Sequence, residues 1–414
     1  MADHAHEGPE LSAASHALRR RRTAAVVLAG FCAFLALYAP QPLLPMLAAV
    51  FGKSAAAISF TVTVSTIAVA VAAPLAGAAA DRFGRRNAIV WAAFLVAAPT
   101  LLAATARSFG QLLFWRCLQG LFTPGIFAIT VAYINEEWDE GGGAAMAAYV
   151  TGTVLGGFCG RTISALVASH SSWRWSFIFL GTLNTLGAAA IWAWLPPGRR
   201  LASAGSRVCA VRAMARHLRN PRLVATYAVG FCVFFTLLTT FTYVNFYLAA
   251  PPFRLSTAAL GWLFVVYLVG AAITPFAGRL IDRMGHRYAL TAAFLGGAAG
   301  ICLTLVRSLP VVMAGLALCC TGVFVAQAAA SSYIGAAASE ARAAAVGLYV
   351  MFYYSGGSIG ATVAGPLWSR GGWPACVALI ACAQALTIAL ALRFWPPGAP
   401  PISTRRALRA LSPT

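Results

Sequence analysis

The chain has 414 residues, of which 60% are hydrophobic and only 10% are charged. A soluble domain usually carries about 25% charged residues, so this composition excludes a soluble globular protein and favours one that is surrounded by lipid. The net charge of +20 would also suit nucleic-acid binding, but the arginines stand between apolar runs and do not form one face, so we expect no nucleic-acid partner.

Twelve apolar runs follow one another along the chain. A helix needs roughly 20 apolar residues to cross the hydrocarbon layer of a membrane. Only helices and closed barrels satisfy their backbone in lipid, and these runs are too long and continuous for strands. The sequence therefore predicts an all-α membrane protein with spans near residues 24–49, 57–80, 88–106, 110–134, 144–168, 174–195, 223–249, 257–281, 288–306, 310–335, 343–367 and 374–395.

The first run follows four arginines, Arg19–Arg22, which is also the pattern of a signal peptide. The run is too long for a signal peptide and eleven more follow it, so we expect an uncleaved span. Its prolines, Pro40, Pro42 and Pro45, should break or kink the helix.

The distribution of arginine predicts the orientation in the membrane, because basic residues are enriched in cytoplasmic loops. With a cytoplasmic N-terminus, that side receives the clusters at 19–22, 82–86, 199–222 and 279–287 together with the C-terminal arginines. The opposite side keeps only scattered basic residues. Both termini are therefore predicted to be cytoplasmic.

Residues 196–222 contain seven arginines and read as a cytoplasmic linker between two halves. A basic surface helix within it and a simply solvated segment are both open alternatives. The predicted organisation is a cytoplasmic tail (1–22), a six-helix bundle (23–195), the linker (196–222), a second six-helix bundle (223–395) and a cytoplasmic C-terminal tail (396–414).

The two halves match at an offset of 200 residues. Gly30-Phe31-Cys32 recurs as Gly230-Phe231-Cys232, and Pro196-Pro197-Gly198 recurs as Pro396-Pro397-Gly398. Six is an even number of spans, so both copies cross the membrane in the same sense. This predicts a parallel repeat, which suits two bundles that rock around a central site.

One motif stands between spans 2 and 3 and again between spans 8 and 9. The copies read Gly77-Ala-Ala-Ala-Asp81-Arg82-Phe83-Gly84-Arg85-Arg86 and Gly278-Arg-Leu-Ile-Asp282-Arg283-Met284-Gly285-His286-Arg287. Gly84 and Gly285 suit a tight turn, and Gly77 and Gly278 would let neighbouring helices approach closely. The pattern resembles the G-x-x-x-D-R-x-G-R-R signature of the major facilitator superfamily.

The resemblance implies a cytoplasmic latch, in which the motif's Asp and Arg pair with groups on helices 4 and 11. Asp81 and Arg85 are similar to those residues, and Glu136 and Glu137 at the end of span 4 are their expected anionic partners. Breaking such a pair would bias an equilibrium between two conformations.

Three further stretches narrow the resemblance. They are Arg116-Cys-Leu-Gln119-Gly120 in span 4, Tyr38-Ala-Pro40-Gln41-Pro42-Leu-Leu-Pro45 in span 1 and Tyr149–Arg161 in span 5. The first resembles an R-x-x-Q-G element of proton-linked facilitators. Together they are similar to the YnfM-like bacterial inner-membrane transport proteins of the drug and metabolite efflux branch.

Ionisable residues inside spans are candidates for function. All ten acidic residues lie in the N-terminal tail or near the predicted cytoplasmic face, whereas Arg116 and Arg161 lie within spans. Guanidinium groups without a nearby carboxylate favour anions or polar neutral solutes and repel cations. The alternative is that both side chains snorkel out to water.

Polar side chains of spans 1 and 7 occupy related places in the repeat and are expected to line a shared cavity. The predicted substrate-binding residues are Arg116, Gln119, Arg161, Tyr38, Gln41, Asn245, Tyr247 and Tyr354. Hydrogen bonding between helices, without any ligand, is the alternative for each.

The resulting hypothesis is a permease that moves a small solute by alternating access, with proton-linked efflux of a metabolite or drug-like compound implied by the resemblance. The alternatives are a facilitator or exchanger of organic anions or sugars, and a membrane sensor that does not transport. No nucleotide-binding glycine loop, metal cluster or catalytic triad occurs in the sequence. We therefore expect no enzyme activity, cofactor or metal. The resemblance further implies a monomer in a bacterial inner membrane that contacts lipid, with protons as its coupling ion.

Overall fold

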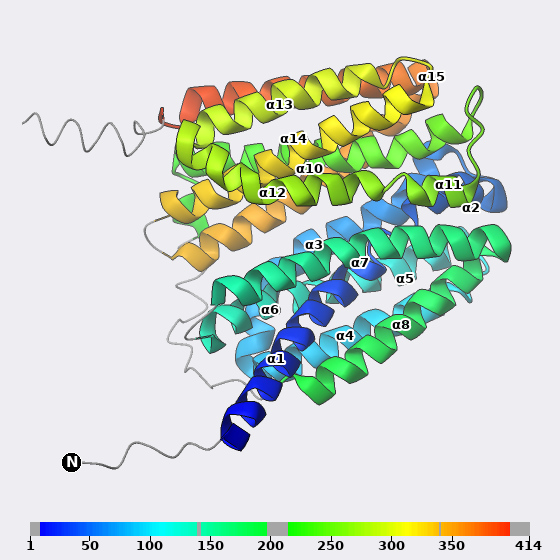
Figure 1. Cartoon of the computed structure of the whole chain (residues 1–414). Helices are drawn as coiled ribbons and strands as arrows, with labels where there is room; N and C mark the ends of the chain where they lie inside the picture. The colour runs from blue at the N-terminus through cyan, green and yellow to red at the C-terminus, as the bar shows by residue number, and fades with distance from the viewer. Residues whose placement is uncertain (1–8, 139–141, 197–213, 339–340, 398–414) are drawn as a thin grey trace, which may run out of the picture.

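The structure is a computed structural model that describes residues 9–138, 142–196, 214–338 and 341–397. Within these ranges the chain forms helices and no strand. Two helical bundles lie one above the other in Figure 1, the N-terminal half in blue to green and the C-terminal half in green to red. The all-α fold is thereby confirmed.

The N-terminal half begins with a helix that is broken near its end. Its elements are α1 (Pro9–Leu35), η1 (Gln41–Leu43), α2 (Leu44–Phe51), α3 (Ala55–Phe83), α4 (Arg85–Ala103), α5 (Phe109–Phe122), α6 (Pro124–Glu137), α7 (Gly142–His170) and α8 (Trp173–Trp194). Helix α1 starts 14 residues before the predicted bundle boundary at residue 23, because the alanines, leucine and arginines of this stretch favour helix.

In the C-terminal half the first span is one helix and the second is broken. The elements of this half are α10 (Pro221–Ala249), α11 (Thr257–Trp262), α12 (Val265–Met284), α13 (His286–Leu303), α14 (Leu309–Ala337) and α15 (Arg342–Phe394). Two helices meet within α15 at Gly372, whose backbone is not helical (φ 59°, ψ −148°).

Eight helices of the described residues are long and apolar enough to cross a membrane, and the bent pair Thr257–Ile273 and Phe276–Met284 makes a ninth. One of the eight, Ala344–Phe394, contains two of the predicted spans, on either side of Gly372. The other two predicted spans are the broken α1–η1–α2 unit and α13. Each of the twelve predicted runs thus falls on a helix or a broken helix.

The two halves touch at one end of the molecule and part at the other. We call the end with the turns at Gly84 and Gly285 the motif end, and the end with α2 and α11 the far end. Leu47 at the far end belongs to the same apolar core as Tyr243 and Trp373 of the C-terminal half. Ala80 at the motif end belongs to a separate core of N-terminal residues only. Figure 1 shows this splaying of the bundles.

Helices α3 and α15 form one side of the far-end contact. The hydroxyl oxygens of Thr66 and Ser358 lie 2.8 Å apart, and a Cβ built on Gly365 would lie 2.6 Å from Cβ of Ala56. On the other side, Thr162 of α7 donates a hydrogen bond to the carbonyl oxygen of Gly261 in α11 over 3.1 Å. The far end is closed by direct helix contact.

The repeat is visible in how closely helices approach within each half. A Cβ on Gly156 of α7 would lie 2.2 Å from the carbonyl oxygen of Phe31 in α1. A Cβ on Gly356 of α15 would lie 2.0 Å from the carbonyl oxygen of Phe231 in α10. Only glycine allows either approach, so equivalent glycines fix the same helix pair in both halves.

Candidate functional site

A cavity of about 290 Å³ lies between the two halves, beneath the far-end contact. Both halves contribute to its wall, so a solute in it would contact the two bodies that must move in alternating access. The lining residues are Phe34, Tyr38, Thr153, Val154, Gly157, Arg161, Phe234, Leu237, Leu238, Tyr267, Phe324, Gln327, Tyr349, Val350, Tyr353 and Tyr354.

Arg161 supplies the positive charge of this cavity. Its side chain is only 3% exposed, so it does not snorkel out to bulk water. Its Nε donates to Oε1 of Gln41 over 2.7 Å, and its Nη1 donates to the carbonyl oxygen of Gly157 over 2.7 Å. No hydrogen bond from Nη2 is found among the described residues. This amino group is the one left to bind a solute.

Three aromatic rings surround the guanidinium of Arg161. Its Cζ lies 4.7 Å from the ring centre of Tyr38, 4.8 Å from that of Phe264 and 4.7 Å from that of Tyr267. Cation–π contacts of this kind stabilise a desolvated cation without neutralising it. The aromatic rings therefore leave the positive charge of Arg161 uncompensated at the cavity.

The opposite wall of the cavity is aromatic and belongs to the C-terminal half. Phe234 of α10 stacks on Tyr353 of α15 with ring centres 4.3 Å apart, and Tyr354 meets Phe234 edge-on at 5.2 Å. Behind them, Tyr349 donates a hydrogen bond to Oε1 of Gln327 over 2.9 Å. These rings offer flat apolar surfaces on which the body of a solute can stack.

Gln41 holds Arg161 in place but does not line the cavity. It is fully buried on η1, and its Nε2 has no hydrogen-bond partner among the described residues. Its amide oxygen faces Nε of Arg161. The break in the first span explains this position, because the turn that follows α1 brings Gln41 across to α7.

Arg116 lies outside the cavity lining. Its guanidinium instead donates hydrogen bonds to backbone carbonyl oxygens. It is 0% exposed, and it donates to the carbonyl oxygens of Ala36, Leu37 and Thr61 as well as to Ser65 and Gln119. Pro40 has no N–H, so the carbonyl of Ala36, four residues earlier, has no helical donor. Arg116 supplies the missing donors where the first span breaks, which also excludes snorkelling.

Three other predicted binding residues also lie away from the lining. Gln119 donates from Nε2 to Oγ1 of Thr100 over 2.6 Å and accepts from Arg116. Asn245 is fully buried and donates to the carbonyl oxygen of Phe241 over 2.6 Å. Tyr247 stacks on Trp373 at 5.4 Å. Gln119 thus forms a hydrogen bond between α5 and α4, which is the alternative that the sequence left open. Tyr247 packs α10 against α15, and Asn245 bonds within its own helix α10.

The first copy of the motif forms a charged cluster at the motif end. Arg85 binds Glu136 of α6 with two hydrogen bonds, Nε to Oε2 over 2.8 Å and Nη2 to Oε1 over 2.6 Å. Nη1 of Arg85 also lies 3.7 Å from Oδ1 of Asp81. Glu137 pairs with Arg22 over 3.0 Å. The structure thus selects Glu136 as the partner of Arg85.

The motif glycines play two different roles. Gly84 and Gly285 have φ of 81° and 80°, a conformation that strongly favours glycine. A Cβ on Gly77 or Gly278 would meet nothing within 4 Å. The predicted close approach of a neighbouring helix at these two positions is absent here, because the halves are apart at this end.

Of the other charged motif residues, Arg86 tethers two helices of the N-terminal half and three lie on the surface. Arg86 donates from Nη2 to the carbonyl oxygen of Trp192 in α8 over 2.7 Å. Arg82 is exposed in the first copy, and Asp282 and Arg283 are exposed in the second. Arg287 extends along Tyr288, its Cζ 5.6 Å from the ring centre.

Sequence reasoning missed most of the aromatic wall. Phe234, Tyr267 and Phe324 look like ordinary apolar residues of a membrane helix. Nothing in the chain marks the contact of Tyr267 with Arg161 and Phe324, or that of Phe234 with Tyr353. Tyr353 is adjacent to Tyr354, which was predicted, and this pair of tyrosines was the one available signal.

Comparison with known proteins gives consistent matches over nearly the whole chain. A family model described as Major Facilitator Superfamily matches residues 26–251 and 241–413. The inner membrane transport protein YnfM of Escherichia coli (strain K12) is 32% identical over 376 residues, covering 90% of this chain and 90% of that protein. The uncharacterized MFS-type transporter YybF of Bacillus subtilis (strain 168) is 30% identical over 363 residues, covering 87% of this chain and 90% of that protein.

A solved structure, that of a mutant of the nucleoside transporter NupG, superposes with a TM-score of 0.75. The match covers 90% of this chain and 100% of the NupG chain, at 14% sequence identity. This likeness shows the fold alone and carries no information about the solute.

Proposed function

This chain belongs to the major facilitator superfamily of membrane transporters, and we propose that it carries a small organic anion across a bacterial inner membrane by alternating access. The observation that carries the proposal is the buried guanidinium of Arg161 in a cavity whose lining contains no carboxylate. The aromatic wall of Phe234 and Tyr353 suits a solute with a flat apolar body.

Electrostatics supports an anion over a cation. In a site of low dielectric a single positive charge attracts an anion and repels a cation much more strongly than it would in water. A carboxylate on the solute would accept a charge-assisted hydrogen bond from Nη2 of Arg161. A polar neutral solute would gain the hydrogen bond but lose most of the Coulomb attraction.

The orientation that we propose places the motif end, both termini and the 196–222 linker in the cytoplasm. The arginines of the motif copies and their neighbours support it, because basic residues are retained on the cytoplasmic side. Since the halves are closed at the far end and apart at the motif end, the conformation described here would be open to the cytoplasm.

Export coupled to proton entry is the mode of transport that we propose, with the protein acting as a monomer. The described residues place no carboxylate in the cavity lining. Proton binding would therefore fall to Asp81, Glu136 or Glu137 at the motif end, or to the carried anion itself. An exchanger or facilitator of organic anions would need no such group, so the effect of a pH gradient separates the two modes.

The test is transport of a matched pair of solutes by purified protein in liposomes. One is an aromatic carboxylate and the other is the amine on the same ring, each supplied with and without a pH gradient. We expect the carboxylate to be transported and the amine to be excluded, and Arg161→Gln to lower carboxylate transport at least about tenfold, as for a lost charged hydrogen bond. Transport of the amine by the wild type and by Arg161→Gln alike would refute the proposal.

A further inference from the structure

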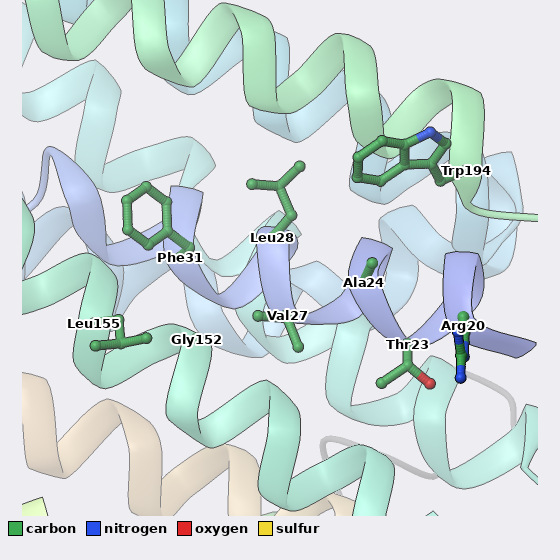
Figure 2. Close-up of a pocket in the computed structure, with 9 residues that line it drawn as sticks. All are labelled: Arg20, Thr23, Ala24, Val27, Leu28, Phe31, Gly152, Leu155 and Trp194. Carbon is green, nitrogen blue, oxygen red and sulfur yellow. The ribbon is translucent and has the colours of Figure 1, made fainter.

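A second hollow, unrelated to the central cavity, runs along the outer face of α1. It is an open groove of about 850 Å³ between α7 and α8. Figure 2 shows its floor on α1, with Gly152 and Leu155 of α7 on one side and Trp194 of α8 on the other. The complete lining is Arg20, Thr23, Ala24, Val27, Leu28, Phe31, Gly152, Leu155 and Trp194.

The residues at the centre of the groove differ from their counterparts in the other half, although the fold repeats. Gly152 has no side chain, and a Cβ there would lie 2.2 Å from the carbonyl oxygen of Val27. At the positions 200 residues further on, Tyr227 replaces Val27 and Phe352 replaces Gly152. These two rings stack with their centres 5.5 Å apart, and Tyr227 is fully buried. Two stacked aromatic rings thus stand in the C-terminal half at the positions that Val27 and Gly152 hold in the N-terminal half.

The dimensions of the groove match one leaflet of a membrane. It extends along α1 from Arg20 to Phe31, which at 1.5 Å per residue is about 16 Å. The hydrocarbon core of a bilayer is about 30 Å thick, so a leaflet is about 15 Å deep. An acyl chain could therefore run along the whole groove without leaving its own leaflet.

The charge of the groove is confined to one end. Arg20 and its neighbour Arg21 are exposed at the motif end, where phospholipid headgroups would lie. The indole of Trp194 lies near the same level and is 41% exposed. Tryptophan is enriched at the membrane–water interface. All the other lining side chains are apolar except that of Thr23, so the groove matches a molecule with an anionic head and a long apolar tail.

We propose that this groove is a binding site for an anionic phospholipid, with the phosphate on Arg20 and one acyl chain along Val27, Leu28 and Phe31. The surface potential of the cytoplasmic leaflet would add to the affinity. The bound lipid would cover the outer side of the contacts that α1 makes with α7 and α8. The site is distinct from the cavity of Arg161 and does not depend on which solute is carried.

The experiment measures lipid binding to the purified full chain in detergent by native mass spectrometry, with phosphatidylglycerol and phosphatidylcholine of identical acyl chains. We expect the wild type to prefer phosphatidylglycerol. Arg20→Gln should lower the affinity for it about fivefold, the effect of one basic residue at an anionic surface. Ala24→Trp, on the exposed floor of the groove, should lower the affinity for both lipids because it occupies the space of the chain.

The repeat provides matched controls. Val224→Trp places the same ring at the equivalent position of α10, and Arg219→Gln removes an exposed arginine outside the groove. Both controls should bind phosphatidylglycerol as the wild type does. Equal losses in Arg20→Gln and Arg219→Gln would show a diffuse basic surface and overturn the proposal. So would unchanged binding in Ala24→Trp, with thermal unfolding used to verify that each variant is folded.

Discussion

At the scale of single residues, two buried arginines of the N-terminal half perform different tasks. Arg116 has backbone carbonyls from α3 and from the break after α1 around its guanidinium, whereas Arg161 has aromatic rings and one free amino group. Carbonyl oxygens use up the donors of Arg116. Rings leave the charge of Arg161 uncompensated, so Arg161 is the one available to a solute.

Arg116→Met should therefore act on stability before it acts on substrate choice. It removes the donor that Arg116 provides to three backbone carbonyls and two side chains. Each hydrogen bond to a charged group contributes about 1.5–3 kcal/mol to the free energy of unfolding. We expect a loss of at least about 3 kcal/mol, seen as a lower midpoint of thermal unfolding in detergent. Arg107→Gln, an exposed arginine nearby, is the control. Equal midpoints for the two variants would contradict the anchoring role.

Gln41 offers a test of charge that keeps the shape of the site. Gln41→Glu retains an oxygen acceptor for Nε of Arg161. Its added negative charge offsets the positive field of the guanidinium in the cavity. We expect its transport of an aromatic carboxylate to fall at least about tenfold, and further than in Gln41→Leu, which loses the hydrogen bond but keeps the positive field. The measurement is KM and maximal rate in liposomes. The opposite order would show that Gln41 acts by position alone.

At the scale of elements, the two motif turns share their backbone but differ in their ion pairs. Arg85 and Glu136 join the turn after α3 to α6 in the N-terminal half. In the second copy His286 stands in place of Arg85 and bonds Oγ of Ser332 over 3.0 Å. The position 200 residues after Glu136 is Ala336, so the acidic partner is missing as well. Within the described residues, which leave out Glu340, the charged latch is found in the first copy.

This asymmetry predicts unequal effects of equivalent substitutions. Asp81→Asn weakens the cluster with Arg85 and should lower the transport rate at least about tenfold while leaving the protein folded, because it alters an equilibrium between conformations. Asp282 is exposed, and no arginine partner is found for it among the described residues. Asp282→Asn should therefore lower the rate less than about threefold. Rates are compared at equal amounts of protein in the membrane. Similar losses of transport rate in both variants would contradict this prediction, because the two motif turns would then contribute equally.

At the scale of the whole molecule, the sequence predicted the features that neighbouring residues encode. It missed the contacts between side chains that lie far apart in the chain. Twelve spans, the repeat and the motif follow from runs of apolar residues and from spacing, and the fold confirms them. The stacking of Phe234 on Tyr353 joins α10 to α15. No sequence feature near either residue predicts this contact. For the same reason Arg116 and Arg161 were indistinguishable until their neighbours were known.

The closed far end and the parted motif end define one state of a two-state transporter. Helices α3 and α15 run in opposite directions past each other and contact at Thr66 and Ser358. Eleven residues further toward the motif end on each helix are Gly77 and Gly347, and a Cβ on either would meet nothing within 4 Å. Alternating access requires the pair at Thr66 and Ser358 to separate and the pair at Gly77 and Gly347 to come into contact.

Cysteine pairs at these positions test that exchange on the same two helices. In a background without the ten native cysteines, Thr66→Cys with Ser358→Cys should be joined rapidly by a short thiol cross-linker in the absence of solute. Gly77→Cys with Gly347→Cys should react slowly, because the halves are apart at the motif end. A transported solute should slow the first reaction and accelerate the second, since it shifts the population toward the other state. The cross-linked far-end pair should not transport, and cleavage of the linker should restore transport. If the motif-end pair reacts as fast as the far-end pair without solute, the resting protein is not open at the motif end.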